Sequence, residues 1–217
     1  MYTLKPFTNF CDPEYLYVSW RRFRRGKRRR KDILVFERHL EDELFSLSEG
    51  LASGRYIHGE YHRFYIRDPK YRMIHKAAVR DRVVHQALYD VLQPLFERKF
   101  FFDSYSGRFS KGTIRAIDRV LSFIRKSSEN GRQAAWVFHG DVDDFFSSID
   151  HKILLAELGK TIRDERYFDI SKKIIHSFSC TPGKGLPLGN LTSQLFANVY
   201  LHELDYFAKK NCASGTM

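Results

Sequence analysis

Apolar residues recur at helical spacing along most of this chain. In residues 34–51 they follow the period of an α-helix, Asp32 is a candidate cap, and Ser53-Gly54 predicts the end of the helix. A second stripe covers residues 79–93, and Pro94 is expected to stop it because proline has no backbone N–H. Further helices are predicted over residues 114–126, 151–158 (with Asp150 as N-cap), 169–178 and 192–210.

Two other stretches have the pattern of strands. Residues 61–75 alternate between apolar and charged positions around Asp68-Pro69-Lys70, which has turn chemistry, so we predict a β-hairpin with Lys70 and Arg72 near its tip. Residues 134–139 are apolar throughout and predict a buried strand. The order of helices and strands is that of a mixed α+β protein.

Composition narrows the class of protein. The chain has 217 residues, of which 43% are hydrophobic and 15% aromatic, enough to build a core. Its net charge of +11 favours a polyanionic partner, with nucleic acid as the first choice. No run of about 18 apolar residues is present, so no membrane partner is expected. Three widely spaced cysteines and no signal-peptide pattern predict a reduced protein of the cytoplasm.

Basic residues are concentrated near the N-terminus. Nine of the eleven residues from Arg21 to Lys31 are Lys or Arg, which predicts an arm that contacts phosphates; a solvated helix face or a targeting patch are the alternatives. A Gly/Ser-rich loop over residues 104–113 adds two cations that could approach a nucleic-acid backbone. The candidate phosphate contacts are Arg21, Arg22, Arg24, Arg25, Lys27, Arg28, Arg29, Arg30, Arg108 and Lys111.

A short acidic segment follows the predicted strand 134–139. Asp141 would lie at the end of that strand, where a carboxylate can bind a divalent cation, and Val142 could add its backbone carbonyl. The turn at Asp143 and Asp144 can direct N–H groups at phosphates, and the ring of Phe146 can close the floor under a sugar. Taken alone, this segment is more typical of a solvated acidic turn.

A second segment, GLPLGNLTSQLFANVYLHELD, spans residues 185–205. Its glycines allow close approach of the backbone, and it leads into a long amphipathic helix. Asn190, Ser193 and Gln194 place polar groups at the start of that helix, where they could meet a template strand. For the apolar stripe of the same helix, ordinary core packing is the alternative.

Three segments together resemble the N-terminal part of a reverse transcriptase of the group II intron-like, bacterial kind. They are RMIHKAAVRDRVVHQALYDVLQPLFERKFFFDSYSGRFSKGT, GDVDDFFSSIDH and GLPLGNLTSQLFAN, and the resemblance is collinear from about residue 30 to residue 208. The pattern Leu188-Gly189-x-x-x-Ser193-Gln194 most resembles the reverse transcriptases of diversity-generating retroelements, which make adenine-directed errors.

This resemblance implies the fingers and partial palm of a right-hand polymerase, without the thumb. It divides the chain into a basic N-terminal arm (1–31), an N-terminal helix with the fingers (32–133) and a partial palm (134–217). The implied activity is that of an RNA-directed DNA polymerase, which acts on template RNA, the RNA/cDNA duplex and dNTPs, possibly with a basic accessory protein. A non-catalytic RNA-binding remnant, or a group II intron or retron-type enzyme, is the alternative.

The resemblance also assigns roles to residues. Asp141 is the catalytic aspartate and, with the carbonyl of Val142, a ligand of Mg²⁺; two ions are expected, and Mn²⁺ could replace them. Phe146 matches the position that excludes a 2′-hydroxyl. The Tyr-x-Asp-Asp turn that supplies further carboxylates in this family does not occur in the sequence, so residues 1–217 alone are expected to be truncated and inactive. The implied nucleotide contacts are Lys70, Arg72, Asp143, Asp144, Phe145, Phe146, Leu188 and Gly189.

Overall fold

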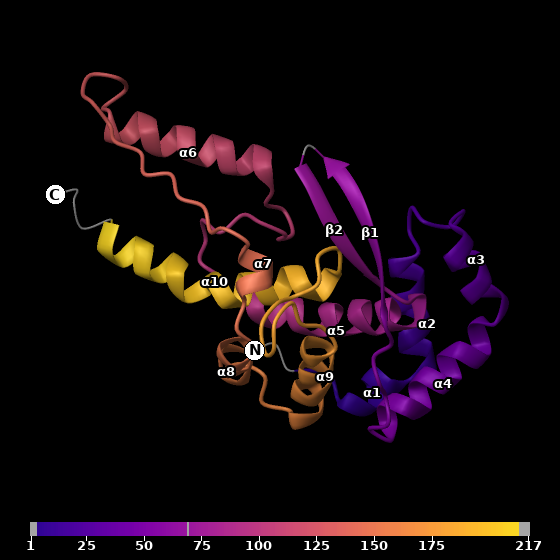
Figure 1. Ribbon diagram of the computed structural model, residues 1–217. Helices are drawn as coiled ribbons and strands as arrows, with labels where there is room; N and C mark the ends of the chain where they lie inside the picture. The colour runs from indigo at the N-terminus through magenta and orange to yellow at the C-terminus, as the bar shows by residue number, and fades with distance from the viewer. Residues whose placement is uncertain (1–3, 69, 213–217) are drawn as a thin grey trace.

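The computed structural model describes residues 4–68 and 70–212 (Figure 1). Four helices come first and a β-hairpin follows: α1 (Phe7–Cys11), α2 (Pro13–Phe23), α3 (Lys31–Arg38), α4 (Leu40–Ala52), β1 (Tyr61–Asp68) and β2 (Lys70–Ala77). Six further helices complete the described chain: α5 (Val79–Glu97), α6 (Thr113–Ser127), α7 (Phe145–Ser148), α8 (His151–Gly159), α9 (Glu165–His176) and α10 (Leu191–Cys212).

Helix α5 lies at the centre of the hydrophobic core. It packs against α2 on one side and α10 on the other, and its Leu88 and Leu92 are completely buried. Trp20 of α2 and Phe196 of α10 are buried in the same cluster. Burial of large apolar side chains is the main favourable term in folding, so this three-helix contact supports the elements around it. Residues from all three predicted segments of the chain share this core.

The basic segment is not a separate extension, which differs from the predicted arm. Residues 21–23 continue α2, and the opposite face of that helix buries Trp20 and Phe23. The apolar residues interleaved with the arginines therefore hold this part of the segment against the core, while the arginines stay on the solvent side.

Two predicted helix boundaries are wrong. The single helix over 34–51 is two helices that meet at His39, whose φ of −120° and ψ of 28° lie outside the helical range. Helix α5 does not end at Pro94 but continues to Glu97, because Phe96 in its last turn is buried in the core and offsets the hydrogen bond that proline lacks. The N-cap at Asp150 is confirmed, since its carboxylate accepts hydrogen bonds from the backbone N–H groups of Lys152 and Ile153.

Asp32 is not a helix cap. It lies inside the first turn of α3 and accepts hydrogen bonds from Lys76 of β2 (2.7 Å) and Arg82 of α5 (2.6 Å). Burial acts to raise its pKa, but these two hydrogen bonds prevail and lower the pKa of Asp32 to about 2. The carboxylate thus ties the N-terminal helices to the hairpin and to the central helix.

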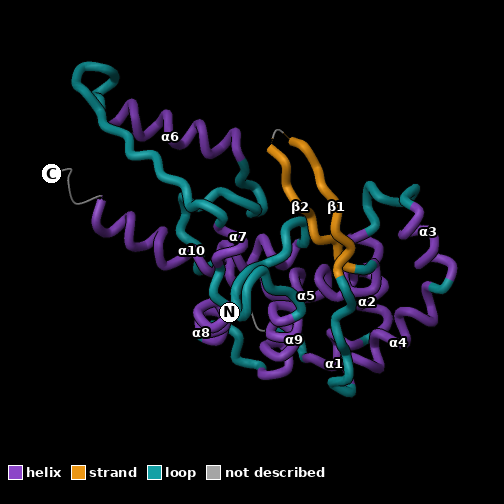
Figure 2. Tube along the Cα trace, in the orientation of Figure 1, coloured by secondary structure: helices purple, strands orange, loops and turns teal. Residues whose placement is uncertain are grey.

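The predicted hairpin is confirmed. Strands β1 and β2 pair antiparallel, with Tyr61 opposite Ala77 and Asp68 opposite Lys70. Pro69, in the predicted turn, lies outside the described residues. The hairpin projects beyond the helical body, as Figure 2 shows, with Lys70 and Arg72 toward its free end.

The predicted buried strand over residues 134–139 is wrong. This segment has no regular structure, and Trp136 and Phe138 are 97% and 96% exposed. A strand needs a hydrogen-bonding neighbour, and the only sheet among residues 4–68 and 70–212 is the β1–β2 pair, which lies elsewhere (Figure 2). Helix α6 also leaves its apolar stripe exposed, and the exposed fraction of Ile114 is 78%.

No helix in the described ranges has the length and apolar character needed to cross a membrane.

Candidate nucleotide site

Backbone hydrogen bonds join the two motif segments that the sequence separates by more than thirty residues. The N–H of Leu186 donates to the carbonyl of Phe146, and that of Gly185 donates to Ile149, both at 2.8 Å. Gly185 has a φ of +107°, and a Cβ there would come within 2.9 Å of the backbone N of Cys180. Glycine is therefore required where the second segment passes the first.

The hairpin is joined to the same loop. The N–H of His75 in β2 donates to the carbonyl of Leu188 (3.1 Å), and the side-chain amide of Asn190 donates to the carbonyl of His75 (2.8 Å). Gly189 lies between these two contacts with a φ of +99°. The hairpin, helix α7 and the loop 185–190 thus meet at one place, which fixes the walls of a cavity.

Replacement of Gly189 by alanine is expected to destabilise the chain by roughly 2–3 kcal/mol. The added Cβ would lie 2.8 Å from Cγ2 of Ile74, and the positive φ adds backbone strain. Urea denaturation measures the loss. The matched control is Gly26→Ala, where φ is also positive (+73°) but no heavy atom lies within 4 Å of the added Cβ. Equal losses in the two variants would show that the close packing of Gly189 on Ile74 is unimportant.

A cavity of about 550 Å³ lies where these elements meet. Six of the eight predicted nucleotide contacts line it: Lys70, Arg72, Asp144, Phe145, Phe146 and Leu188. The two cations come from the exposed end of the hairpin, and they face the start of α7, whose first residues follow the left-handed Asp144 (φ 43°). Phe145 and Phe146 are half-buried and form an apolar part of the wall, with Met73, Phe178 and Leu186. A cationic end and an apolar floor suit a ligand with a phosphate tail and a flat hydrophobic part.

Asp143, Gly189 and the predicted metal ligands do not line this cavity. Asp141 is exposed, and one of its carboxylate oxygens accepts a hydrogen bond from the N–H of Val142 (3.0 Å). Its oxygens suit a hard cation such as Mg²⁺. Within the part of the chain that the structure describes, however, no group of three or more His, Cys, Asp or Glu side chains is placed to hold a metal ion. These residues alone therefore do not complete a metal site.

A second, smaller cavity of about 270 Å³ lies on the other face of the hairpin. In the inner part of β2, Met73 and His75 line the first cavity and Ile74 and Lys76 line the second, because alternate residues of a strand point to opposite faces. Nearer the free end, residues of both faces of β2, from Lys70 to Met73, line the first cavity. We call it the basic cavity, since Lys27, Arg30, Lys76 and Arg82 all line it, together with Gly189 and Asn190. The sequence prediction missed Lys76 and Arg82. The spacing of residues along the sequence does not predict that these two side chains lie together behind the hairpin.

The polar residues at the start of α10 are less accessible than predicted. Asn190 is 3% exposed and Ser193 is 2% exposed, and the amide of Asn190 is used to hold the hairpin. Their role in this structure is internal rather than on a nucleic-acid surface. Gln194 remains exposed, and its side chain approaches Gly107 of the loop 104–112.

Arg108 has a structural role that differs from the predicted phosphate contact. Its side chain is only 6% exposed and pairs in bidentate fashion with Glu97 (Nη2 at 2.7 Å). The same guanidinium donates to the backbone carbonyls of Phe101 and Ser104. Lys111 likewise donates to the carbonyl of Phe102 and lies 3.6 Å from the centre of that ring. Both cations stabilise the loop from inside.

The basic segment divides into paired and exposed cations. Arg22 forms an ion pair with Asp90 (2.8 Å), Arg24 pairs with Glu37, and Lys27 donates to the carbonyl of Phe23. Burial, followed by the nearby charges of Arg82 and Arg30, lowers the pKa of Lys27. The other arginines of the segment, Arg21, Arg25, Arg28, Arg29 and Arg30, are exposed, and these stay candidates for phosphate contacts.

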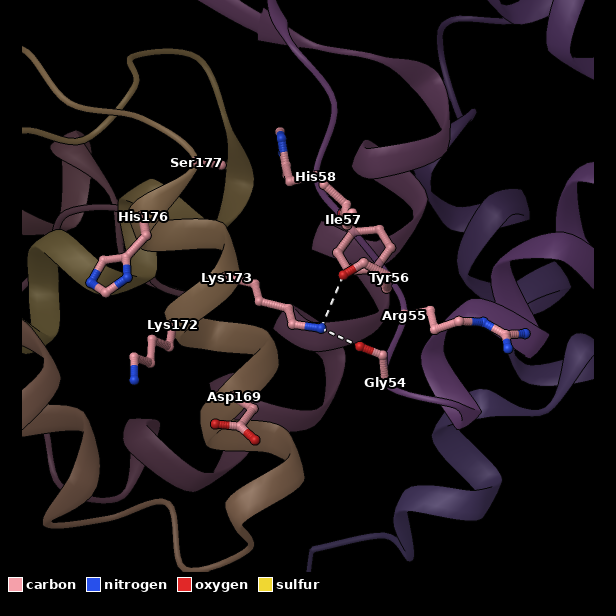
Figure 3. Close-up of a pocket in the computed structure, with 10 residues that line it drawn as sticks. All are labelled: Gly54, Arg55, Tyr56, Ile57, His58, Asp169, Lys172, Lys173, His176 and Ser177. Carbon is pink, nitrogen blue, oxygen red and sulfur yellow. Dashed lines mark hydrogen bonds between the residues drawn. The ribbon is translucent and has the colours of Figure 1, made fainter.

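The largest cavity described, about 910 Å³, is distant in sequence from the predicted site (Figure 3). It lies between residues 54–58 and α9, and Lys173 crosses it to donate to the carbonyls of Gly54 and Tyr56. None of the predicted nucleotide contacts lines it. Its lysine is used to hold two elements together, so the nucleotide site is assigned to the cavity beside the hairpin.

Comparison with known proteins identifies relatives. No family model matches the sequence. The chain is 28% identical to protein YkfC of Escherichia coli (strain K12) over 189 residues. This alignment covers 83% of this chain and 49% of YkfC. It is 26% identical over 176 residues to the group II intron-encoded protein LtrA of Lactococcus lactis subsp. cremoris, covering 77% of this chain and 28% of LtrA. The chain thus spans about half, or less, of the length of these relatives.

Two further comparisons agree. An uncharacterized 91 kDa protein in a cob intron of Schizosaccharomyces pombe is 29% identical over 134 residues, covering 59% of this chain and 16% of that protein. Among solved structures, a chain of a partial Cas6-RT-Cas1–Cas2 complex matches with a TM-score of 0.54 and 19% identity, covering 93% of this chain and 34% of that one. At that identity the match supports the α+β fold alone. The sequence relatives confirm the predicted resemblance: the chain is similar to group II intron-encoded proteins, as expected for the N-terminal part of a group II intron-like reverse transcriptase.

Proposed function

We propose that this chain forms the nucleotide-binding part of an RNA-directed DNA polymerase, which copies a template RNA into cDNA. The observation that carries the proposal is the cavity of about 550 Å³, in which the hairpin cations meet α7 and Leu188. The relationship to group II intron-encoded proteins supports the same reaction class. In this proposal the hairpin, α5 and the loop 104–112 belong to the fingers, and residues 134–212 belong to the palm.

Each wall of the cavity has a role in nucleotide binding. Lys70 and Arg72 are exposed at the hairpin end, where their charges can bind the triphosphate. The ring of Phe146 lies where it can pack under the sugar and exclude a 2′-hydroxyl. Asp141 and the Val142 carbonyl would contribute to binding two Mg²⁺ ions, together with carboxylates from outside this chain. Such ions neutralise phosphate charge and lower the pKa of the attacking hydroxyl.

The double variant Lys70→Ala/Arg72→Ala is expected to weaken dNTP binding by roughly tenfold to a hundredfold in the presence of Mg²⁺. Each charge-assisted contact to a phosphate contributes about 1–2 kcal/mol, and both are lost. Binding is measured by titration with a fluorescent dNTP analogue at fixed ionic strength. Lys152→Ala/Arg28→Ala is the control, because it removes the same charge from exposed positions away from the cavity. Equal affinities in both double variants would contradict the site.

We also propose that the polymerase is of the diversity-generating retroelement type. The apolar side chain of Leu188 lines the nucleotide cavity and offers no amide to the templated base pair. In the full-length protein, Leu188→Gln is expected to lower adenine-directed misincorporation severalfold, because the added amide can supply a selective hydrogen bond. Sequencing of cDNA products measures this, with Leu186→Gln, on the same cavity wall, as the control. An unchanged error spectrum would favour a group II intron or retron-type enzyme.

RNA is the proposed template partner. The basic cavity, which Arg30 helps to line, lies on the side of the hairpin opposite the nucleotide cavity, and Arg28 and Arg29 are exposed next to Arg30 in the sequence. In this proposal these cations hold a template strand by its phosphates. The same cations, together with the incomplete metal site, favour a second candidate, a non-catalytic RNA-binding protein. RNA binding that weakens steeply with salt fits both candidates, whereas dNTP binding at the hairpin cavity fits only the polymerase. A basic accessory protein would add to the RNA-binding surface.

A further inference from the structure

A buried pair of histidines links the segment before β1 to the start of α10. The Nε2 atom of His58 lies 3.0 Å from Nε2 of His85, which belongs to α5. The other ring nitrogen of His85, Nδ1, lies 3.4 Å from the hydroxyl of Thr192 in α10. The His58 side chain is 1% exposed and His85 is 2% exposed, so water does not compete for these contacts. In Figure 3 the side chain of His58, at the edge of that cavity, points away from Lys173.

The neighbours of His58 determine which nitrogen carries its proton. Nδ1 lies 2.6 Å from the carbonyl oxygen of Gly59, which can only accept a hydrogen bond, so Nδ1 carries the hydrogen. In a neutral ring the Nε2 atom of His58 is then an acceptor, and His85 must donate to it from its own Nε2. That leaves Nδ1 of His85 to accept from the Thr192 hydroxyl. The two imidazoles therefore have opposite tautomers.

Asp81 of α5 fixes this arrangement. Its carboxylate accepts hydrogen bonds from the hydroxyl of Tyr56 (2.9 Å) and from the N–H of Gly59 (3.1 Å), on either side of His58. A Cβ at Gly59 would come within 3.0 Å of that carboxylate. The backbone around His58 is thus held against α5, which aims the ring at His85.

We propose that the His58–His85 pair positions Thr192, and through it the segment 188–192, whose Leu188 lines the candidate nucleotide site. This segment is then held from two sides, by His75 of the hairpin through Leu188 and Asn190, and by His85 of α5 through Thr192. His58 and His85 are positioning residues, since neither lines the nucleotide cavity. The link to nucleotide binding rests on the proposed function, but the geometry of the pair does not.

Burial favours a neutral ring at His85. It is the largest cause that lowers the pKa of His85 from 6.5 to about 3, and the nearby charge of Arg82 acts in the same direction. Because the unfolded chain binds a proton more readily than the folded one, the stability that the pair provides falls as the pH drops from about 6.5 toward 3. The titratable and charged groups that face the pair are Tyr56, Tyr61, Asp81 and Arg82, and across the basic cavity Lys27, Arg30 and Lys76.

The tautomers can be tested on the unchanged chain. At pH 7 the ¹⁵N spectrum of the imidazoles is expected to show hydrogen on Nδ1 of His58 and on Nε2 of His85, with a coupling across the hydrogen bond between the two Nε2 atoms. The same tautomer in both rings, or a positive charge on either, would overturn the proposal. This measurement requires neither a variant that folds nor a nucleotide.

A variant pair tests the positioning role. His58→Leu is expected to speed hydrogen exchange of the amides in residues 188–193 by about tenfold, because one internal hydrogen bond is lost. His58→Gln should restore slow exchange, since its amide can donate to Gly59 and its carbonyl can accept from His85. Tyr61→Phe, which removes a nearby bond to Ser177, is the control. Unchanged exchange in His58→Leu would refute the role. Faster exchange with unchanged dNTP affinity would support it and count against the proposed nucleotide site instead.

Discussion

In the proposed polymerase, Asp141→Asn is expected to lower the rate of primer extension on an RNA template by about a thousandfold or more. The carboxylate of Asp141 is exposed and has only the N–H of Val142 as a described partner, so its oxygens are open to a cation. An amide keeps the shape but loses the negative charge. The loss of one metal ligand removes several kcal/mol of transition-state stabilisation, which corresponds to this factor in rate.

The control for this variant is Asp42→Asn, an exposed aspartate in the first turn of α4. Both variants remove one negative charge, so a general effect of net charge on RNA binding would appear in both. Circular dichroism and urea denaturation verify that Asp141→Asn is folded. A folded Asp141→Asn enzyme with the parental rate would exclude Asp141 from the reaction and favour the RNA-binding candidate.

Arg108→Ala destabilises the chain by roughly 2–3 kcal/mol and leaves RNA affinity nearly unchanged. The substitution breaks a bidentate pair and leaves Glu97 and two backbone carbonyls without their donor. The Glu97 side chain is 30% exposed, so water can solvate the unpaired carboxylate and compensate part of the loss. The expected loss of stability is therefore at the low end of the range for breaking a buried ion pair. The stability loss is measured by urea denaturation and RNA binding by fluorescence anisotropy.

Two further variants are controls for the Arg108→Ala prediction. Arg28→Ala, at an exposed position, is expected to weaken RNA binding and to leave stability within about 0.5 kcal/mol. Arg108→Met/Glu97→Gln removes both charges, and it should be more stable than Arg108→Ala because no partly buried carboxylate is left unpaired. If Arg108→Ala weakened RNA binding as much as Arg28→Ala at unchanged stability, the internal role of Arg108 would be wrong.

Local patterns in the sequence predicted most helices because their causes are local. Asp150 caps α8 through its own backbone neighbours, and the stripe of α5 faces the core as its spacing requires. The hairpin followed from alternation and turn chemistry. The nucleotide cavity did not follow from spacing, because it needs the contact between Leu186 and Phe146, forty residues apart. That juxtaposition was expected only from the resemblance to a family.

The failures have a common cause in long-range contacts. Residues 134–139 have strand composition, but composition does not supply a neighbouring strand. Arg108 and Asn190 were predicted to lie on the surface because both are polar. Each instead donates hydrogen bonds to acceptors inside the protein, which allows its burial. The His58–His85 pair joins two segments that show no common pattern. Its only signal in the sequence was two histidines in otherwise apolar or aromatic surroundings.

Photo-crosslinking with 8-azido-dATP in the presence of Mg²⁺, followed by peptide mapping, tests the central claim most directly. Three cavities among the described residues exceed 500 Å³, and only one of them is assigned to the nucleotide. The account predicts crosslinks within residues 70–75, 144–147 and 186–188, which unlabelled dATP suppresses. Specific crosslinks confined to residues 54–58 and 169–177, around the cavity of Figure 3, would contradict it.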